Sequence, residues 1–161
     1  MRVKKAPKAN KNNKKVHEID EHKRLKTTLK EVMGLCGLKF DLEVALNFSG
    51  TKDEHGNLVD ECSIDVAAYG ENKNKSFLII FECKGGKDLP EIHKKISAWE
   101  ANIQKIKERK TTIISSEENS IKEKDFNKFD EIRVCYVFGV NTDNDKFLQI
   151  AATLQNRNFY A

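Results

Sequence analysis

Two apolar, strand-forming segments of the sequence carry charged residues: one at its end and the other within it. Glu82 and Lys84 directly follow the apolar run Phe77–Phe81, and Asp65 interrupts the apolar segment 62–69. Alternate residues of a strand point to the same face, so Glu82 and Lys84 are expected side by side. A carboxylate in such a position is costly unless it is paired or binds a metal ion. These three residues are therefore the first candidates for chemistry.

The chemistry that suits these residues is metal-assisted hydrolysis. Neighbouring antiparallel strands lie about 4.8 Å apart, so Asp65 and Glu82 could meet around a divalent cation that relieves their repulsion. Ligation by oxygen alone favours Mg²⁺ or Mn²⁺ over zinc. Lys84 would then reach the attacking water or a scissile phosphate, which fits phosphodiester hydrolysis. The alternative is an ion pair of Lys84 with Asp65 or Glu82 on a solvent-facing side of the sheet.

The tripeptide Glu-x-Lys is not informative by itself, because it occurs three more times. Glu21-His22-Lys23, Glu71-Asn72-Lys73 and Glu108-Arg109-Lys110 lie on a predicted helix, in a turn and at a helix end, where charges face solvent at little cost. The two histidines of the segment 17–22 are five residues apart, which puts them about 140° apart around a helix and excludes a zinc-protease motif. The four cysteines contain no Cys-x-x-Cys pair, so a zinc site is not expected.

Hydrophobic periodicity predicts an α/β fold with helices on the faces of a mixed sheet. The predicted elements are a helix at 17–36, strands at 38–48, 62–69 and 77–84, a helix from Pro90 to about 110, a short strand at 111–115, a strand at 131–140 and a helix at about 145–155. The first helix carries an apolar stripe made of Leu25, Leu29, Val32 and Cys36, with glycines at its end. Every second residue from Leu38 to Leu46 is apolar and is expected on one face of the first strand. Short connections favour an antiparallel meander of the first three strands, followed by a crossover strand.

The composition points to a single domain, which we assign to residues 17–161. Hydrophobic residues make up 39% of the 161, and the longest apolar run has five residues, so no membrane-spanning segment is expected. No signal-peptide pattern is present, and the cytoplasm is the expected location. The net charge is +4, yet the first 16 residues contain seven basic residues and no acidic one. We predict that this arm is flexible and serves either to bind a polyanion or as a solvated tail.

The spacing of the charged residues resembles the motif of a known superfamily. Asp65, followed 17 residues later by Glu82-Cys83-Lys84 at the end of an apolar strand, is similar to the motif of the PD-(D/E)xK nucleases, which have a restriction-endonuclease-like fold. The order of the elements from 17 to about 140 also resembles the core of that superfamily. The resemblance implies that Asp65, Glu82 and the backbone carbonyl of Cys83 bind Mg²⁺ (or Mn²⁺), and that Lys84 activates or positions the attacking water. The chain departs from the pattern at Ile64, which stands in place of the proline that many members also lack.

Members of this superfamily often carry another acid on the first helix. Glu18 and Glu21 are the candidates here, with Glu43 of the first strand as a third choice. Complementation of the helix dipole would explain the two helix acids equally well. The basic residues that could contact phosphates are Lys87, Lys94 and Lys95 after the motif, and Lys14 and Lys15 in the arm. A solvated surface is the alternative explanation for each of these lysines.

These features together predict a Mg²⁺-dependent endonuclease that hydrolyses DNA phosphodiester bonds, such as the nuclease domain of a restriction or anti-phage defence protein. The basic arm would add affinity for DNA that does not depend on sequence and falls with salt. The alternative is a catalytically inactive domain of the same fold that binds nucleic acid or a protein partner. A homodimer and additional domains of a larger protein are both compatible with the sequence.

Overall fold

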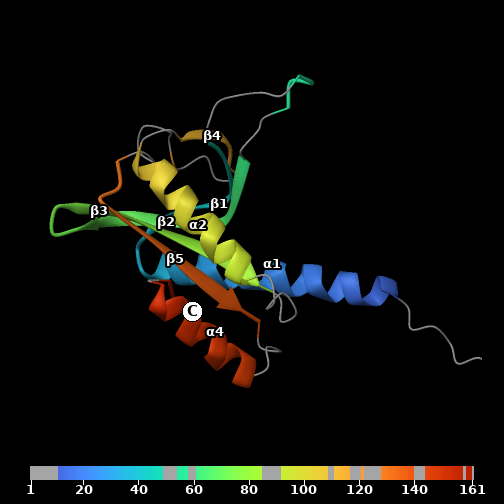
Figure 1. Ribbon diagram of the computed structural model, residues 1–161. Coiled ribbons are helices and arrows are strands. Elements are labelled where there is room, and N and C mark those ends of the chain that lie inside the picture. The colour runs from blue at the N-terminus through green and yellow to red at the C-terminus, as the bar shows by residue number, and fades with distance from the viewer. Residues whose placement is uncertain are drawn as a thin grey trace, which may run out of the picture.

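The computed structural model describes residues 11–48, 54–57, 61–84, 92–108, 111–116, 121, 128–139, 144–157 and 159–160. Its helices and strands are α1 (Lys11–Leu35), β1 (Lys39–Asn47), β2 (Glu61–Asn72), β3 (Lys75–Lys84), α2 (Ile92–Lys107), β4 (Thr112–Ser115), β5 (Glu131–Phe138) and α4 (Asn144–Asn156) (Figure 1). This arrangement confirms the predicted α/β class, including the short strand at 111–115.

The five strands form one mixed sheet in the order β4-β1-β2-β3-β5. β1, β2 and β3 are antiparallel to their neighbours in this meander. Between β2 and β3 the chain turns through Lys73 and Asn74, both with positive φ, which is the geometry of a tight two-residue hairpin. The chain then returns through α2 and β4, and β5 pairs in parallel with β3. The predicted meander and crossover strand are thus confirmed.

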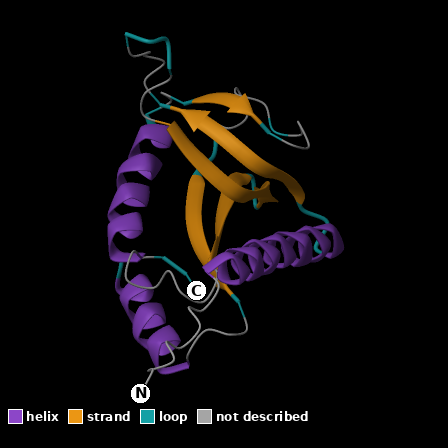
Figure 2. Cartoon of the chain, turned by 90° about the vertical axis from the view of Figure 1, so that its right-hand side faces the viewer, coloured by secondary structure: helices purple, strands orange, loops and turns teal. Residues whose placement is uncertain are grey.

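Helices cover both faces of the sheet and divide the apolar side chains into two cores. The larger core lies between the sheet and α2 with α4, and it includes Ile80, Trp99 and Leu154. The smaller core lies under α1 and includes Leu29 and Phe81. Figure 2 shows the sheet between α1 on one side and α2 with α4 on the other. Among the described residues, no helix is both long enough and apolar enough to cross a membrane.

α1 starts earlier than predicted and ends at a glycine cap. It begins at Lys11 rather than at 17, so the last six residues of the predicted arm belong to the helix. Gly37 adopts a φ of 66°, and the N–H of Leu38 donates to the carbonyl of Met33 with an N···O distance of 3.0 Å. This is a Schellman cap, in which glycine is favoured because it enters the left-handed region without strain. The expected glycine termination is confirmed, while residues 1–10 of the arm lie outside the described residues.

The buried face of α1 differs from the predicted stripe. Leu29 and Met33 are buried, whereas Val32 is 41% exposed and Cys36 is exposed. The prediction is therefore wrong for Val32 and Cys36. The steps of four residues from Leu25 through Leu29 to Met33 follow one side of the helix, and this side packs on the sheet. Sequence periodicity alone did not distinguish it from the adjacent stripe, because α1 carries apolar residues at both Val32 and Met33.

The alternation of side chains in β1 and β2 is interrupted where Glu43 faces Asp65. Leu42 and Val44 have ladder partners on β2, but the two acidic residues between these pairs are not paired. Glu43 has a φ of 49°, in the left-handed region. As a result Leu42 packs under α1 and Val44 packs in the core on the α2 side. The expectation that the apolar residues of this strand share one face is wrong, because a left-handed residue reverses the side on which the following side chains emerge.

The assignment of the α1 face can be tested by a pair of alanine substitutions. Met33→Ala removes a buried side chain and is expected to lower the free energy of unfolding by about 2 kcal/mol. Val32→Ala, one position away on the exposed side, should change it by less than about 0.5 kcal/mol. Urea denaturation followed by circular dichroism measures both values. Equal losses in the two variants, or a larger loss for Val32→Ala, would contradict the observed packing.

Candidate active site

Asp65 lies in a fork between two strands. The ladder of β2 with β3 reaches as far as the pair of Val66 and Phe81 and does not continue beyond it. Past this pair, the backbone N–H of Cys83 donates to Oδ2 of Asp65 at 2.7 Å. A carboxylate has thus taken the place of the backbone carbonyl that would accept this hydrogen bond in a regular sheet. The position of the Asp65 carboxylate is fixed by the backbone of β3, next to Glu82.

Glu82 and Lys84 form a buried ion pair at the end of β3. Lys84 Nζ lies 3.1 Å from Glu82 Oε2, and only 7% of the Lys84 side chain and 9% of the Glu82 side chain are exposed. The two residues share a face, as predicted from their spacing. The ion pair considered as an alternative does exist, but it is buried rather than solvent-facing. The other carboxylate oxygen of Glu82, Oε1, is buried and makes no hydrogen bond within the described residues.

The electrostatics of the site show that its charged groups act on one another. Burial raises the pKa of Glu82, Lys84 lowers it, and the nearby Asp65 carboxylate raises it further. Burial would lower the pKa of Lys84, but Glu82 and also Asp65 raise it, so that Lys84 keeps its proton. Burial, together with Asp65, raises the pKa of the Cys83 thiol to about 12, which makes this side chain an inert part of the core.

The two carboxylates approach the fork from different layers, not as neighbours on one face. Asp65 Oδ2 lies 3.2 Å from Nε2 of His22, which belongs to α1. Glu82 points to the other side, where Lys95 of α2 lowers its pKa and Tyr136 of β5 lies beside it. The expectation of a simple cross-strand pair on one face is therefore wrong: at the strand ends Asp65 faces α1 and Glu82 faces α2.

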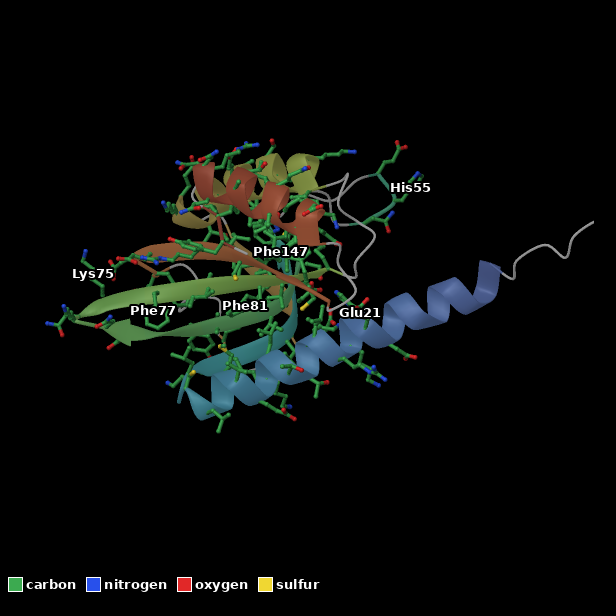
Figure 3. The ribbon with its side chains drawn as sticks, turned by 90° about the horizontal axis from the view of Figure 1, so that it is seen from below. Glu21, His55, Lys75, Phe77, Phe81 and Phe147 are labelled. Atoms are coloured by element: carbon green, nitrogen blue, oxygen red, sulfur yellow. The ribbon has the colours of Figure 1, made fainter. Side chains whose placement is uncertain are left out.

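Glu21 reaches the same end of the sheet from α1 (Figure 3). Its Oε1 atom is buried, has no hydrogen-bond partner within the described residues, and lies where a Cβ on Gly139 would be. The N–H of Gly139 donates to the carbonyl of Lys84 at 3.1 Å, so the Glu21 carboxylate is placed at the end of β3. Of the two acids proposed on the first helix, Glu21 is thus found at the site. Glu18 lies on α1, but its side chain is outside the described part of the chain.

Two contacts from α1 were not anticipated. His22, one of the two histidines whose spacing excludes a zinc motif, contacts Asp65. Lys26, one turn further along α1, forms an ion pair with Glu43, which therefore has a partner of its own. The spacing of these residues is consistent with both contacts, since positions 22, 26, 29 and 33 follow each other along one side of a helix. That side could be recognised only once Met33, and not Val32, was known to be buried.

The predicted phosphate-contacting lysines are only partly described. The Lys95 side chain is half-buried and acts on both Glu82 and Lys84, whereas Lys94 is exposed. Lys87 lies outside the described residues. Lys14 and Lys15 are part of α1, but nothing is described of their side chains.

The residues present are compatible with a magnesium ion. The described part of the chain holds no group of three or more histidine, cysteine, aspartate or glutamate side chains arranged around one metal position. Mg²⁺ does not need such a group, because it keeps several waters and is usually bound by one or two carboxylates and by substrate phosphates. The buried Oε1 atoms of Glu82 and Glu21 make no hydrogen bonds within the described residues, and such unsatisfied anionic oxygens are what a cation would satisfy.

No family model matches the chain, and neither a curated protein nor a solved structure matches it. The resemblance to PD-(D/E)xK nucleases therefore rests on Asp65, Glu82 and Lys84 and on the order of the elements.

Because Glu82 and Lys84 form a buried ion pair, removing the positive charge of Lys84 should reduce stability, and the size of that loss should depend on pH. Lys84→Met leaves Glu82 buried without its main counter-charge, and the free energy of unfolding should fall by about 3 kcal/mol at pH 7. Burial already holds the pKa of Glu82 above its ordinary value of 4.5. As the pH falls through this raised pKa, Glu82 becomes protonated in the folded state before it does so in the unfolded state. The stability lost in Lys84→Met should therefore become smaller at lower pH.

Denaturant titrations at several pH values measure this loss. Adding Glu82→Gln to the Lys84→Met variant should recover part of the stability at pH 7, because it removes the unpaired charge. A loss that is the same at pH 5 and pH 7, with no recovery in the double variant, would show that the two side chains do not interact as described.

Proposed function

We propose that this chain is a magnesium-dependent endonuclease domain that hydrolyses DNA phosphodiester bonds. The observation that carries the proposal is the Asp65 carboxylate held in the fork of β2 and β3 by the N–H of Cys83, beside a buried Glu82. Acidic groups with perturbed pKa values cluster at functional sites. The meander followed by a parallel strand, with helices on both faces, supports a restriction-endonuclease-like core.

The acidic residues of the site have separate roles in this proposal. Asp65 is oriented by Cys83 and His22, and Glu82 and Glu21 each offer a buried oxygen that no described group satisfies. Asp65 and Glu82 would hold the ion together with water, with Glu21 at the same end of β3, and the ion when bound would supply Lewis-acid activation and neutralise charge on the phosphate. The energetic cost of keeping these oxygens buried and unpaired is consistent with a binding role, because a bound cation would offset it.

The lysines would act on the phosphate. Lys84 keeps its proton, so it serves as a fixed positive charge that positions water and stabilises negative charge at the scissile group, not as a general base. Lys95 of α2 stands on the same side of the sheet as Lys84 and acts on both Glu82 and Lys84, so it adds a second positive charge to the site. DNA is preferred over RNA as substrate because the resemblance favours it.

Plasmid nicking in the presence of Mg²⁺ tests the proposal. Asp65→Asn, Glu82→Gln and Lys84→Met should each reduce the nicking rate by at least about 100-fold, since each removes charge where the reaction needs it. Glu71→Gln is a matched control, because it changes the same residue type in another Glu-x-Lys sequence, at the exposed hairpin end of β2.

The control should nick at the parent rate. Circular dichroism must show that each variant is folded at the assay temperature. Equal nicking by the parent and all three site variants would refute the proposal, and the absence of nicking by the parent would favour an inactive domain of this fold.

The position of Glu21 yields a second test that leaves the acidic residues intact. Gly139→Ala places a methyl group where the Glu21 carboxylate lies, and the end of this flexible side chain must move away. Nicking should fall about as much as in Glu21→Gln, with little change in melting temperature. Gly34→Ala is the control, since a Cβ there meets no atom within 4 Å. Full activity in Gly139→Ala would show that the Glu21 carboxylate has no part in the reaction.

A further inference from the structure

A second candidate site lies at the opposite end of β3 from Glu82. There the surface holds a hollow of about 440 Å³, lined by Lys73, Lys75, Phe77, Ile79, Glu131 and Arg133. Figure 3 shows Lys75 and Phe77 toward the hairpin end of the sheet and Glu21 at the other end. The hollow shares no residue with the candidate active site, and its volume is within the range of small-ligand pockets.

The floor of this hairpin hollow is apolar and includes an aromatic ring. Phe77 pairs with Gly70 across the strands. A Cβ on Gly70 would lie 2.9 Å from Cζ of Phe77, so the ring rests directly over the glycine. Ile79, two residues along on the same face, is partly buried and joins the core under α1. The side chains of Phe77 and Ile79 thus form a half-buried apolar surface that continues the α1 side of the sheet.

The rim of the hairpin hollow carries an excess of positive charge. Three of its residues are basic and one, Glu131, is acidic. Arg133 is held in place, because its Nη2 lies 3.2 Å from Glu131 Oε2 and its guanidinium lies 5.6 Å from the ring centre of Tyr160. Asp130 lies near Lys75, but its Oδ2 accepts hydrogen bonds from the N–H and the hydroxyl of Ser76. Asp130 stays charged and offsets part of this excess, but the lining of the hollow, with three basic side chains and one acidic side chain, still carries a net positive charge.

We propose that the hairpin hollow binds a nucleotide unit, with the base on the apolar floor and the phosphate at the rim. A bare anion would gain nothing from Phe77 and Ile79, and a neutral apolar ligand would gain nothing from three cations. A flat aromatic group joined to a phosphate uses both, because bases stack on aromatic side chains and phosphates pair with arginine and lysine. The unit belongs either to a free nucleotide or to a single strand of nucleic acid. This inference does not depend on the nuclease proposal.

Calorimetric titration in metal-free buffer containing EDTA tests the site while the candidate active site is left without a divalent ion. The probes are ATP, tripolyphosphate, adenosine and a short oligothymidylate. ATP or the oligonucleotide should bind at least about tenfold more tightly than tripolyphosphate or adenosine, which each lack one half of the recognised unit. Binding of only one of the first two identifies the source of the nucleotide unit.

Three variants and a control locate the binding. Lys75→Gln, Arg133→Gln and Phe77→Leu should each weaken it by about tenfold, the last because leucine keeps an apolar side chain but has no ring to stack on. Lys107→Gln removes an exposed lysine at the end of α2 that does not line the hollow, and should leave binding unchanged.

Three results would overturn this inference. These are no binding of either nucleotide probe at millimolar concentration, equal binding of ATP and tripolyphosphate, and loss of affinity in Lys107→Gln as large as in Lys75→Gln. Because Lys75 and Arg133 are surface side chains, their variants are expected to fold even where Phe77→Leu does not. None of these results bears on the nicking assay, so the two proposals can fail separately.

Discussion

The separation of β3 from β2 beyond the pair of Val66 and Phe81 is the feature on which the candidate site depends. In a regular antiparallel sheet, a backbone carbonyl would accept the N–H of Cys83, and the side chain of Asp65 would point out of the sheet. Here the carboxylate accepts that N–H itself and lies between the strand ends. The unpaired position of Asp65 opposite the left-handed Glu43 is the local irregularity that accompanies this arrangement.

One side of α1 both packs on the sheet and carries residues of the candidate site. Leu29 and Met33 anchor the helix on the sheet, and the preceding turns bring Glu21 and His22 to the end of β3. The site therefore depends on the register of α1 on the sheet. Buried carboxylate oxygens without partners cost stability, and the rest of the domain must supply that stability through its two cores. Such a cost is expected where charged groups are kept ready for a ligand, and it sets this end of β3 apart from the exposed Glu71 end of β2.

Much of the fold could be predicted, because it depends on local patterns. Short connections gave the antiparallel meander, and the charged ends of apolar strands indicated Asp65, Glu82 and Lys84. The remainder depends on contacts between distant segments. The choice between Val32 and Met33 is decided by the sheet that α1 meets, and the same choice determines that His22 and Glu21 face the site. The change of side at Glu43 is caused by one residue in a left-handed conformation, which has no signature in the sequence because glutamate rarely adopts it.

The most direct test of the central claim is a calorimetric titration with Mn²⁺ of the parent and of Asp65→Asn. If Asp65 in the fork and Glu82 beside it form a cation site, the parent should bind Mn²⁺ with a dissociation constant in the millimolar range or below. The isosteric Asn variant keeps an acceptor for the N–H of Cys83 but should lose that binding. Identical titrations of the two proteins, or no binding by a folded parent, would contradict the account.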